Sequence, residues 1–243
     1  MMRDYKVETE KRIAFIRGKM KEAGATGLVF GNSGGKDSVL VGILCKMACE
    51  NTVGIIMPCQ SKRNYGEDAD DGMAVAKQFN IETRTVDLSA VRGAVIGALE
   101  PITELNKQAL TNIAPRLRMI TVYAVGAAEN RLVAGTGNRT ERYLGYFTKW
   151  GDGAFDLNPI ADLTVREVYE FLRYLDAPEN IINKAPSAGL FEGQTDEAEL
   201  GLTYSDVDDF ILEGNAKKET EEKILRYHRI SEHKRKLPAT YEG

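Results

Sequence analysis

The stretch Gly27–Ser38, GLVFGNSGGKDS, decides the fold of this chain. Its first part, Gly27–Gly31, is a short apolar run between two glycines, which is typical of a buried strand. A polar, glycine-rich turn follows, and Asp37–Cys49 then has the pattern of a helix. A glycine-rich turn between a strand and a helix exposes backbone N–H groups and the positive end of the helix, and both bind phosphate.

The turn also carries side chains that suit a phosphate ligand. Gly34 and Gly35 remove side chains where a phosphate must approach the backbone. The hydroxyls of Ser33 and Ser38 can donate to phosphate oxygens. Asp37 would repel a phosphate unless a cation lay between them, so it suggests a Mg²⁺ ligand. A tight turn with a capped helix and no ligand is the alternative explanation.

Two better-known phosphate motifs do not fit this turn. The Walker A motif needs GxxxxGK[ST], and Lys36 stands where its second Gly falls. The dinucleotide fingerprint needs GxGxxG, and Ser33 replaces its second Gly. The sequence therefore predicts a phosphate loop of another kind.

Composition limits the class of protein. The 243 residues are 43% hydrophobic and 28% charged, as in ordinary globular proteins, and no repeat or linker divides them, so we expect a single domain over residues 1–243. A net charge of -4 argues against a general nucleic-acid binder. No apolar run approaches the roughly 18 residues that span a bilayer, and the N-terminus has no apolar signal region. We expect a cytoplasmic protein without a nucleic-acid or membrane partner.

Predicted strands and helices alternate along the first half of the chain. Three further apolar or β-branched runs predict strands at Val53–Met57, Ile81–Val86 and Leu132–Gly135. Apolar spacing predicts helices over residues 4–23, 67–79 and 89–99, and a long helical region to about Glu129 that is re-entered at Pro115. This alternation predicts an α/β fold with a doubly wound parallel sheet, Rossmann-like in form.

The last hundred residues have a different pattern, which predicts extra C-terminal helices. Tyr146–Asp162 is a loop rich in Gly and Asp. Thr164–Glu167 is a capping box that opens a helix to about Leu175. Lys184–Thr203 is long and irregular, and a basic, polar helix closes the chain. We expect the loops Pro58–Asp71 and Lys184–Thr203 to order when substrate binds, because both are polar and placed to cover strand ends.

The sequence SGGKDS resembles the SGGxDS pyrophosphate loop of the N-type ATP pyrophosphatases, which have the adenine nucleotide alpha-hydrolase type of fold. Those enzymes cleave ATP to AMP and pyrophosphate while they adenylate a substrate. Further segments resemble NAD synthetase in particular and occur in that family's order. They are Arg116–Met119, Gly135–Glu141, Gly145–Pro159, Lys184–Leu190 with Gln194–Gly201, and Glu232–Pro238.

The resemblance implies an ammonia-dependent NAD synthetase, a ligase. The carboxylate of nicotinic acid adenine dinucleotide (deamido-NAD) attacks ATP, pyrophosphate leaves, and ammonia then displaces AMP. A carboxylate acylates poorly until its oxygen becomes a good leaving group, so the protein mainly positions and neutralises two polyanions. The resemblance also implies a homodimer with the substrate site near its interface.

The same resemblance assigns roles to individual residues. The catalytic residues and Mg²⁺ ligands are Asp37 and Glu141, and Lys184 is expected to close over the phosphates. The other expected ATP-binding residues are Gly31, Asn32, Ser33, Gly34, Gly35, Lys36, Ser38, Thr136 and Ser187. The expected residues for the deamido dinucleotide are Arg116, Lys149, Asp156, His233 and Lys234. Without the resemblance, Glu141 is an acid in a first helical turn, and the basic pair near the C-terminus belongs to a solvated face.

One position departs from the family, and the resemblance also implies which nitrogen donor is used. The family often has a Lys that contacts ATP where this chain has Val165, so either Arg166 takes that role or the contact is lost. Glutamine-dependent members carry an additional amidase domain with a cysteine nucleophile, whereas Cys45 and Cys49 here are expected to pack in the core. With Cys59 they form no CxxC pair, which argues against a zinc or disulfide site. Free ammonia is the expected donor, and a separate glutaminase stays open.

Two rival functions are weighed against this interpretation. One is another adenylating member of the superfamily, such as a tRNA thiolase, which commonly needs a cysteine pair and a basic face; neither is evident. The other is a regulatory module that binds ATP without turnover. Two acids at predicted strand ends argue against that module, because a pure ATP binder needs fewer metal ligands.

Overall fold

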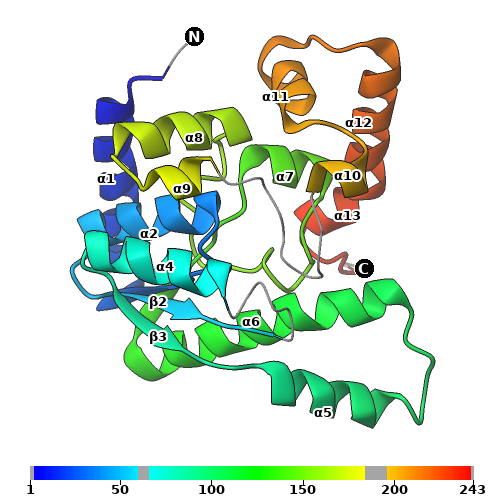
Figure 1. The fold of residues 1–243 in the computed structure, drawn as a ribbon, viewed down its shortest axis with the longest axis horizontal. Coiled ribbons are helices and arrows are strands. Elements are labelled where there is room, and N and C mark those ends of the chain that lie inside the picture. Colours follow the sequence, from blue (N-terminus) through cyan, green and yellow to red (C-terminus); the bar gives the residue numbers. More distant parts are fainter. Residues whose placement is uncertain (1–2, 60–65, 184–195, 242–243) are drawn as a thin grey trace.

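The computed structural model describes residues 3–59, 66–183 and 196–241, and a parallel sheet lies at its centre (Figure 1). The strand order is β3-β2-β1-β4. The strands are β1 (Gly27–Gly31), β2 (Thr52–Ile56), β3 (Glu82–Thr85) and β4 (Arg131–Ala134). Because β2 and β4 flank β1, the winding reverses between β1 and β4, and such a switch point is where doubly wound sheets bind ligands. The predicted fold class and all four predicted strands are confirmed.

Helices cover both faces of the sheet because its central strands β1 and β2 are buried on both sides, whereas the edge strand β3 is polar. In β1, Leu28 and Phe30 pack into one buried cluster and Val29 into the other. In Figure 1, one pair of helices lies below the sheet and a larger group lies above it. The pair is α5 (Ser89–Leu99) and α6 (Lys107–Glu129). The group comprises α1 (Tyr5–Ala23), α2 (Lys36–Ala48), α4 (Glu67–Gln78), α8 (Val165–Tyr174) and α9 (Glu179–Ile182).

The remaining helices form a separate layer beside the sheet, on the right of Figure 1. They are α7 (Arg139–Leu144), α10 (Asp196–Leu200), α11 (Tyr204–Glu213), α12 (Lys218–Ile230) and α13 (Glu232–Arg235). A third apolar cluster holds this layer together, with Leu144, Val207 and Ile224 fully enclosed. The predicted extra C-terminal helices are therefore present.

Three expectations about individual elements need correction. Pro115 does not interrupt the long helical region, because α6 runs through it. A proline inside a helix loses one hydrogen bond, at a cost of about 3 kcal/mol, and the burial of α6 against the sheet offsets that cost. The basic closing helix is two helices, α12 and α13, which meet at the buried Ser231. The irregular segment Lys184–Thr203 contains the short helix α10.

Two other predictions are confirmed locally. The capping box is present: the N–H of Thr164 donates to Glu167 Oε2 at 2.8 Å, and α8 begins there. Cys45 is fully buried among the helices on one face. Among the described residues, no helix combines the length and apolar character that crossing a membrane requires.

Candidate active site

A cavity of about 670 Å³ lies where the carboxyl ends of β1, β2 and β4 meet α6. One end is lined by the glycine-rich turn after β1 and by Thr136 and Glu141 after β4. We call this the phosphate end. The lining also includes Arg118 of α6, Asp152, and Lys234 of α13, which lie outside those segments, and we call this set the far end. The switch point of the sheet therefore opens onto a single cavity with chemically different ends.

Hydrogen bonds within the chain shape the turn at the phosphate end. The Asn32 side chain is buried, donates to the carbonyl of Gly72 at 3.1 Å and accepts from the N–H of Gly34 at 3.3 Å. The hydroxyls of Ser33 and Ser38 lie 3.0 Å apart. Helix α2 starts directly after the turn, and no side chain caps its N-terminus. The first N–H groups of α2 are thus placed for an anionic ligand.

Gly34 is required by geometry. Its φ of 70° lies in the left-handed region, and a Cβ there would come within 2.2 Å of the carbonyl oxygen of Asp68 in α4. The backbone of the turn therefore packs directly on α4. Gly34 is not among the described residues that line the cavity, so it shapes the turn from behind.

One buried side chain connects the two predicted metal ligands. Asn138 has no exposed surface, and its Nδ2 donates to Asp37 Oδ1 at 3.1 Å. Its Oδ1 accepts from the N–H of Glu141 at 2.9 Å, which caps α7. Its own N–H lies 3.3 Å from Glu141 Oε2. The structure thus brings Asp37 and Glu141 to one place although they lie a hundred residues apart.

Lys36 lies between these carboxylates. Its Nζ is 2.6 Å from Asp37 Oδ2 and 3.6 Å from Glu141 Oε1, and its side chain is 7% exposed. Burial alone would lower the pKa of Lys36, but the two carboxylates outweigh burial and raise it. Burial, and then the charge of Asp37, raise the pKa of Glu141 to about 8. Lys36, Asp37 and Glu141 thus form a cluster of charged groups in which the pKa values of Lys36 and Glu141 are shifted, and such clusters are typical of active sites.

The donor set fits Mg²⁺. Within the described ranges, no group of three or more His, Cys, Asp or Glu side chains could hold a metal ion. Mg²⁺ is commonly held by one or two carboxylates, with phosphate oxygens and water completing the octahedron. Asp37 and Glu141 supply such a pair beside a phosphate loop. The cation now between them is the Lys36 ammonium, so this point of the site already stabilises positive charge.

Polar groups from three distant segments meet at the far end. Lys234 Nζ donates to the carbonyls of Gly145 and Phe147 at 2.8 Å each, and it lies over the Phe147 ring. The Asp152 carboxylate accepts from the N–H of Thr148 at 3.0 Å. Arg118 Nε donates to the carbonyl of Met57 at 3.2 Å. Burial lowers the pKa of Arg118 and of Lys234. The far end therefore combines two cations with one carboxylate.

Several residues expected to bind the dinucleotide lie away from the cavity. Arg116, Lys149 and His233 cluster on the surface: Lys149 Nζ donates to the His233 carbonyl at 2.9 Å, and Arg116 Nη2 donates to the Lys149 carbonyl at 3.4 Å. Asp156 accepts from the N–H of Val133 at 2.7 Å and from Tyr123. None of these four side chains is among the described residues that line the cavity, whereas Lys234 is.

Other expectations fall outside the described residues or meet a different partner. Lys184 and Ser187 lie in the range 184–195, which the structure does not describe, and the same gap and residues 60–65 take up much of the two expected lids. Arg166 pairs with Asp209 of α11 and does not line the described cavity. Arg166 as a replacement for the missing family Lys therefore stays a prediction.

Sequence reasoning left out three residues that the geometry brings to the site: Asn138, Arg118 and Asp152. Asn138 lies in the GTGNRTE segment, where an Asn three residues before a Glu is a capping signal. Arg118 is two residues beyond the predicted Arg116, and only its burial singles it out. Asp152 lies in a quoted glycine-rich segment, and the sequence carries no signal for its position.

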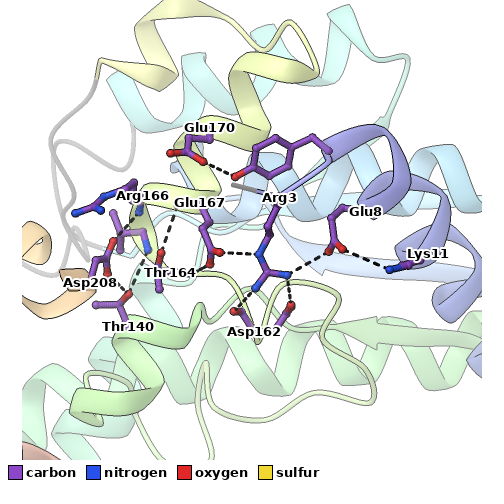
Figure 2. Close-up of polar contacts among 12 residues, drawn as sticks. Arg3, Glu8, Lys11, Thr140, Asp162, Thr164, Arg166, Glu167, Glu170 and Asp208 are labelled. Carbon is purple, nitrogen blue, oxygen red and sulfur yellow. Dashed lines mark hydrogen bonds and ion pairs between the residues drawn. The ribbon is translucent and has the colours of Figure 1, made fainter. Parts of the chain in front are cut away.

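A polar network behind the cavity fixes the helix that carries Glu141 (Figure 2). Asp208 of α11 accepts from the hydroxyl of Thr140 and from the N–H of Arg166 at 2.7 Å. The Thr140 hydroxyl accepts from the N–H of Val165 at 3.2 Å. Because Thr140 precedes Glu141 in α7, these contacts hold α7 against the start of α8.

The same view shows how the N-terminal segment contacts the start of α8. Arg3 lies 2.6 Å from Glu167 and 2.9 Å from Asp162, and also pairs with Glu8 of α1. Glu167 is the capping acid of α8. The start of α8 is therefore held from two sides.

A parallel doubly wound sheet with a glycine-rich turn and two carboxylates at its switch point defines a nucleotide-binding α/β protein. The chain belongs to the NAD synthase family, whose model matches residues 8–238. It is 49% identical to the NH(3)-dependent NAD(+) synthetase of Carboxydothermus hydrogenoformans over 97% of each chain. It is 43% identical to the enzyme of the same name from Alkaliphilus metalliredigens over 96% of each chain.

Solved structures agree with this assignment. The chain resembles the NMN synthetase of Francisella tularensis, with a TM-score of 0.93, 36% identity and 100% of both chains covered. It also resembles the NH3-dependent NAD synthetase of Campylobacter jejuni, with a TM-score of 0.82 and 30% identity over 99% of this chain and 100% of that one. The expected resemblance to the NAD synthetase family is confirmed.

Proposed function

We propose that this chain is a ligase that uses ATP and ammonia to convert deamido-NAD to NAD, with release of AMP and pyrophosphate. The observation that carries the proposal is the convergence of Asp37, Glu141 and a phosphate loop on one cavity of an NAD synthase family member. The donor is free ammonia, as in the two NH(3)-dependent relatives, and the chain matches those relatives over 97% and 96% of their length.

The residues at the phosphate end position ATP and neutralise its charge. The N–H groups at the start of α2 and the hydroxyls of Ser33 and Ser38 bind phosphate oxygens. Asp37 and Glu141 would hold Mg²⁺, and the ion would supply positive charge that neutralises the pyrophosphate. Asn138 keeps the two carboxylates oriented by its three hydrogen bonds.

The far end receives the pyridine substrate. Arg118 and Lys234 supply positive charge and hold the backbone around Met57 and Phe147 in place. The substrate carboxylate attacks the α-phosphorus of ATP, and pyrophosphate leaves. Ammonia then attacks the adenylated carbonyl, and AMP leaves with both electrons of the broken C–O bond. The protein contributes mainly by alignment, which can supply roughly 7–11 kcal/mol of a barrier of this kind.

One observation favours a second candidate substrate, the mononucleotide precursor of NMN. The neighbour with a TM-score of 0.93 is named NMN synthetase, and it matches this chain over its whole length. Amidation of a mononucleotide uses the same acyl chemistry and needs no site for the adenosine half of a dinucleotide. The curated relatives named NAD synthetase, at up to 49% identity, make the dinucleotide the first choice.

The homodimer is a further part of the proposal. Helix α5 is mostly apolar in sequence, yet none of its residues is buried. Val91 of α5 is 46% exposed, and Ile120 of the adjacent α6 is 57% exposed. An unpaired apolar face of this kind is typical of an interface. We expect sedimentation to give a dimer and Ile120→Asp to give a monomer, whereas Leu225→Asp on α12 leaves the dimer intact.

The cellular location is also part of the proposal. We place the protein in the cytoplasm, because its three cysteines are free and the cytoplasm keeps thiols reduced.

The deciding experiment is a product analysis. The protein is incubated with ATP, Mg²⁺, ammonium and either deamido-NAD or nicotinic acid mononucleotide, and nucleotides are resolved by chromatography. We expect NAD and AMP in equal amounts, with a higher kcat/KM for the dinucleotide. A higher kcat/KM for the mononucleotide would select the second candidate. Formation of ADP, or no nucleotide change at any ammonium concentration, would refute both. Asp37→Asn serves as the inactive control.

A further inference from the structure

Lys36 occupies the variable position of the SGGxDS loop, where the signature itself demands no particular side chain. Here the side chain is a buried lysine on the wall of the cavity. Its Nζ lies 2.6 Å from Asp37 Oδ2 and 3.6 Å from Glu141 Oε1. The Tyr204 ring lies on another side, 5.8 Å from Nζ to its centroid. The ammonium thus stands where the two metal-holding carboxylates converge.

We propose that Lys36 is a displaceable internal counter-ion of the metal site. In the free enzyme its ammonium holds Asp37 and Glu141 together. When a divalent cation takes those carboxylates, the ammonium moves to the phosphates of the nucleotide. The inference rests on the proposed function only in that ATP and a divalent cation share this cavity.

Charge balance supports the exchange. Two carboxylates buried side by side repel each other strongly, and one ammonium between them removes most of that repulsion. A divalent cation that binds the same oxygens brings two positive charges next to the ammonium. Because like charges at such distances repel in a buried site, the ammonium and the metal ion compete for one place.

The geometry gives the displaced ammonium a destination. Lys36 is the first residue of α2, so its stem starts beside the N–H groups that bind phosphate. Ser33 and Gly35 line the same cavity as Lys36. A lysine has a flexible four-carbon stem with a compact charge, so it can exchange one oxygen partner for another by rotation alone.

This role predicts effects of opposite sign on metal binding and on turnover. Removal of the ammonium should strengthen metal binding to the free enzyme, because the competitor is gone. The same change should slow AMP formation, because a cation is lost from the phosphates. A lysine that only filled space, or only helped to bind the metal, would not separate the two effects.

The test uses the whole enzyme without nucleotide and Mn²⁺ as the probe for the metal site. Free Mn²⁺ is followed by electron paramagnetic resonance in a buffer more basic than the raised pKa of Glu141, about 8, so that both carboxyl groups are ionised. Lys36→Met keeps the stem and removes the charge, and Lys36→Gln is a second neutral variant that keeps a hydrogen-bond donor. Lys46→Met is the matched control, because Lys46 lies on the same helix and pairs with the exposed Glu50.

We expect both neutral variants to bind Mn²⁺ at least about tenfold more tightly than the wild type, and Lys46→Met to match the wild type. Without metal, the two Lys36 variants should melt at a lower temperature than the wild type, and Mn²⁺ should restore their melting temperature. Equal or weaker Mn²⁺ binding by the folded Lys36 variants would overturn the proposal, and so would no detectable Mn²⁺ binding by any of the proteins. These readouts need no substrate, so they stand or fall independently of the product assay on the wild type.

Discussion

The phosphate end and the far end of the cavity are built in different ways. At the phosphate end, Asn32–Gly35 form one continuous turn, and hydrogen bonds within that turn and to Ser38 in the first turn of α2 shape it. At the far end, Arg118, Asp152 and Lys234 come from three segments that share no local motif. The glycine-rich turn is a local structure, although it also packs on α4. The far end exists only after the helices have packed.

This difference separates two kinds of functional residue. A turn that binds phosphate uses backbone N–H groups, which depend on local conformation and therefore on a short motif. A pocket for a large organic substrate uses side chains whose positions depend on the packing of remote elements. Asp37 and Glu141 lie between these cases, because each follows a strand end but only the sheet and Asn138 bring them together.

The largest expected effect comes from removing the carboxylate charges at the phosphate end. Asp37→Asn and Glu141→Gln keep shape and remove charge, so AMP formation should fall by roughly 10³-fold while the circular dichroism spectrum stays unchanged. Asp209→Asn, which removes a surface partner of Arg166, should stay within about twofold of the wild type. Near wild-type rates of both site variants in saturating Mg²⁺ would show that the metal assignment is wrong.

The next largest effect is expected from a substitution that disturbs the backbone of the glycine-rich turn at the phosphate end. Gly34→Ala forces a side chain into the left-handed region and against the Asp68 carbonyl. Urea unfolding should show a loss of about 2 kcal/mol or more, together with weaker ATP binding. Gly18→Ala is the matched control, because Gly18 lies within α1 with open space around it. That change should raise stability by about 0.5–1 kcal/mol. If Gly34→Ala leaves the free energy of unfolding unchanged, the turn can adjust its backbone to accept a side chain.

A smaller effect distinguishes the two ends. Lys234→Met removes two hydrogen bonds from a charged group to the backbone around Gly145 and Phe147. We expect the KM for the pyridine substrate to rise about tenfold, with the KM for ATP changed much less. Lys236→Met removes a nearby exposed lysine that pairs with Glu232 and should change neither. Equal increases in both KM values would mean that the ends do not act separately.

The smallest expected effect is a dependence of folding stability on pH in the protein without metal. The pKa of Glu141 is raised to about 8 in the folded protein, against 4.5 as its ordinary value. Between these values the folded state binds more protons than the unfolded state, so stability without metal should fall as pH rises through that window. Mg²⁺ should reverse the fall, because it binds the ionised carboxylate. Melting temperatures across pH with and without Mg²⁺ check this, and Glu141→Gln should weaken the pH dependence.

Local chemistry in the sequence predicted much of the fold. The strand–turn–helix at Gly27–Ser38 and the capping box at Thr164 depend on neighbours within a few residues, and the structure has both. Pro115 shows the limit of that reasoning. Proline opposes a helix locally, but the buried face of α6 outweighs the local cost.

The sequence by itself determined the parallel α/β fold, the phosphate loop and the acidic residues that follow two strand ends, because these depend on periodicity and on short motifs. Only the tertiary structure decided that Asn138 joins Asp37 to Glu141, and that Lys36 lies between them. It also decided that Lys234 faces the cavity while Lys149 and His233 do not. The physical reason is that the direction of a side chain depends on how distant elements pack, and no local pattern encodes that packing.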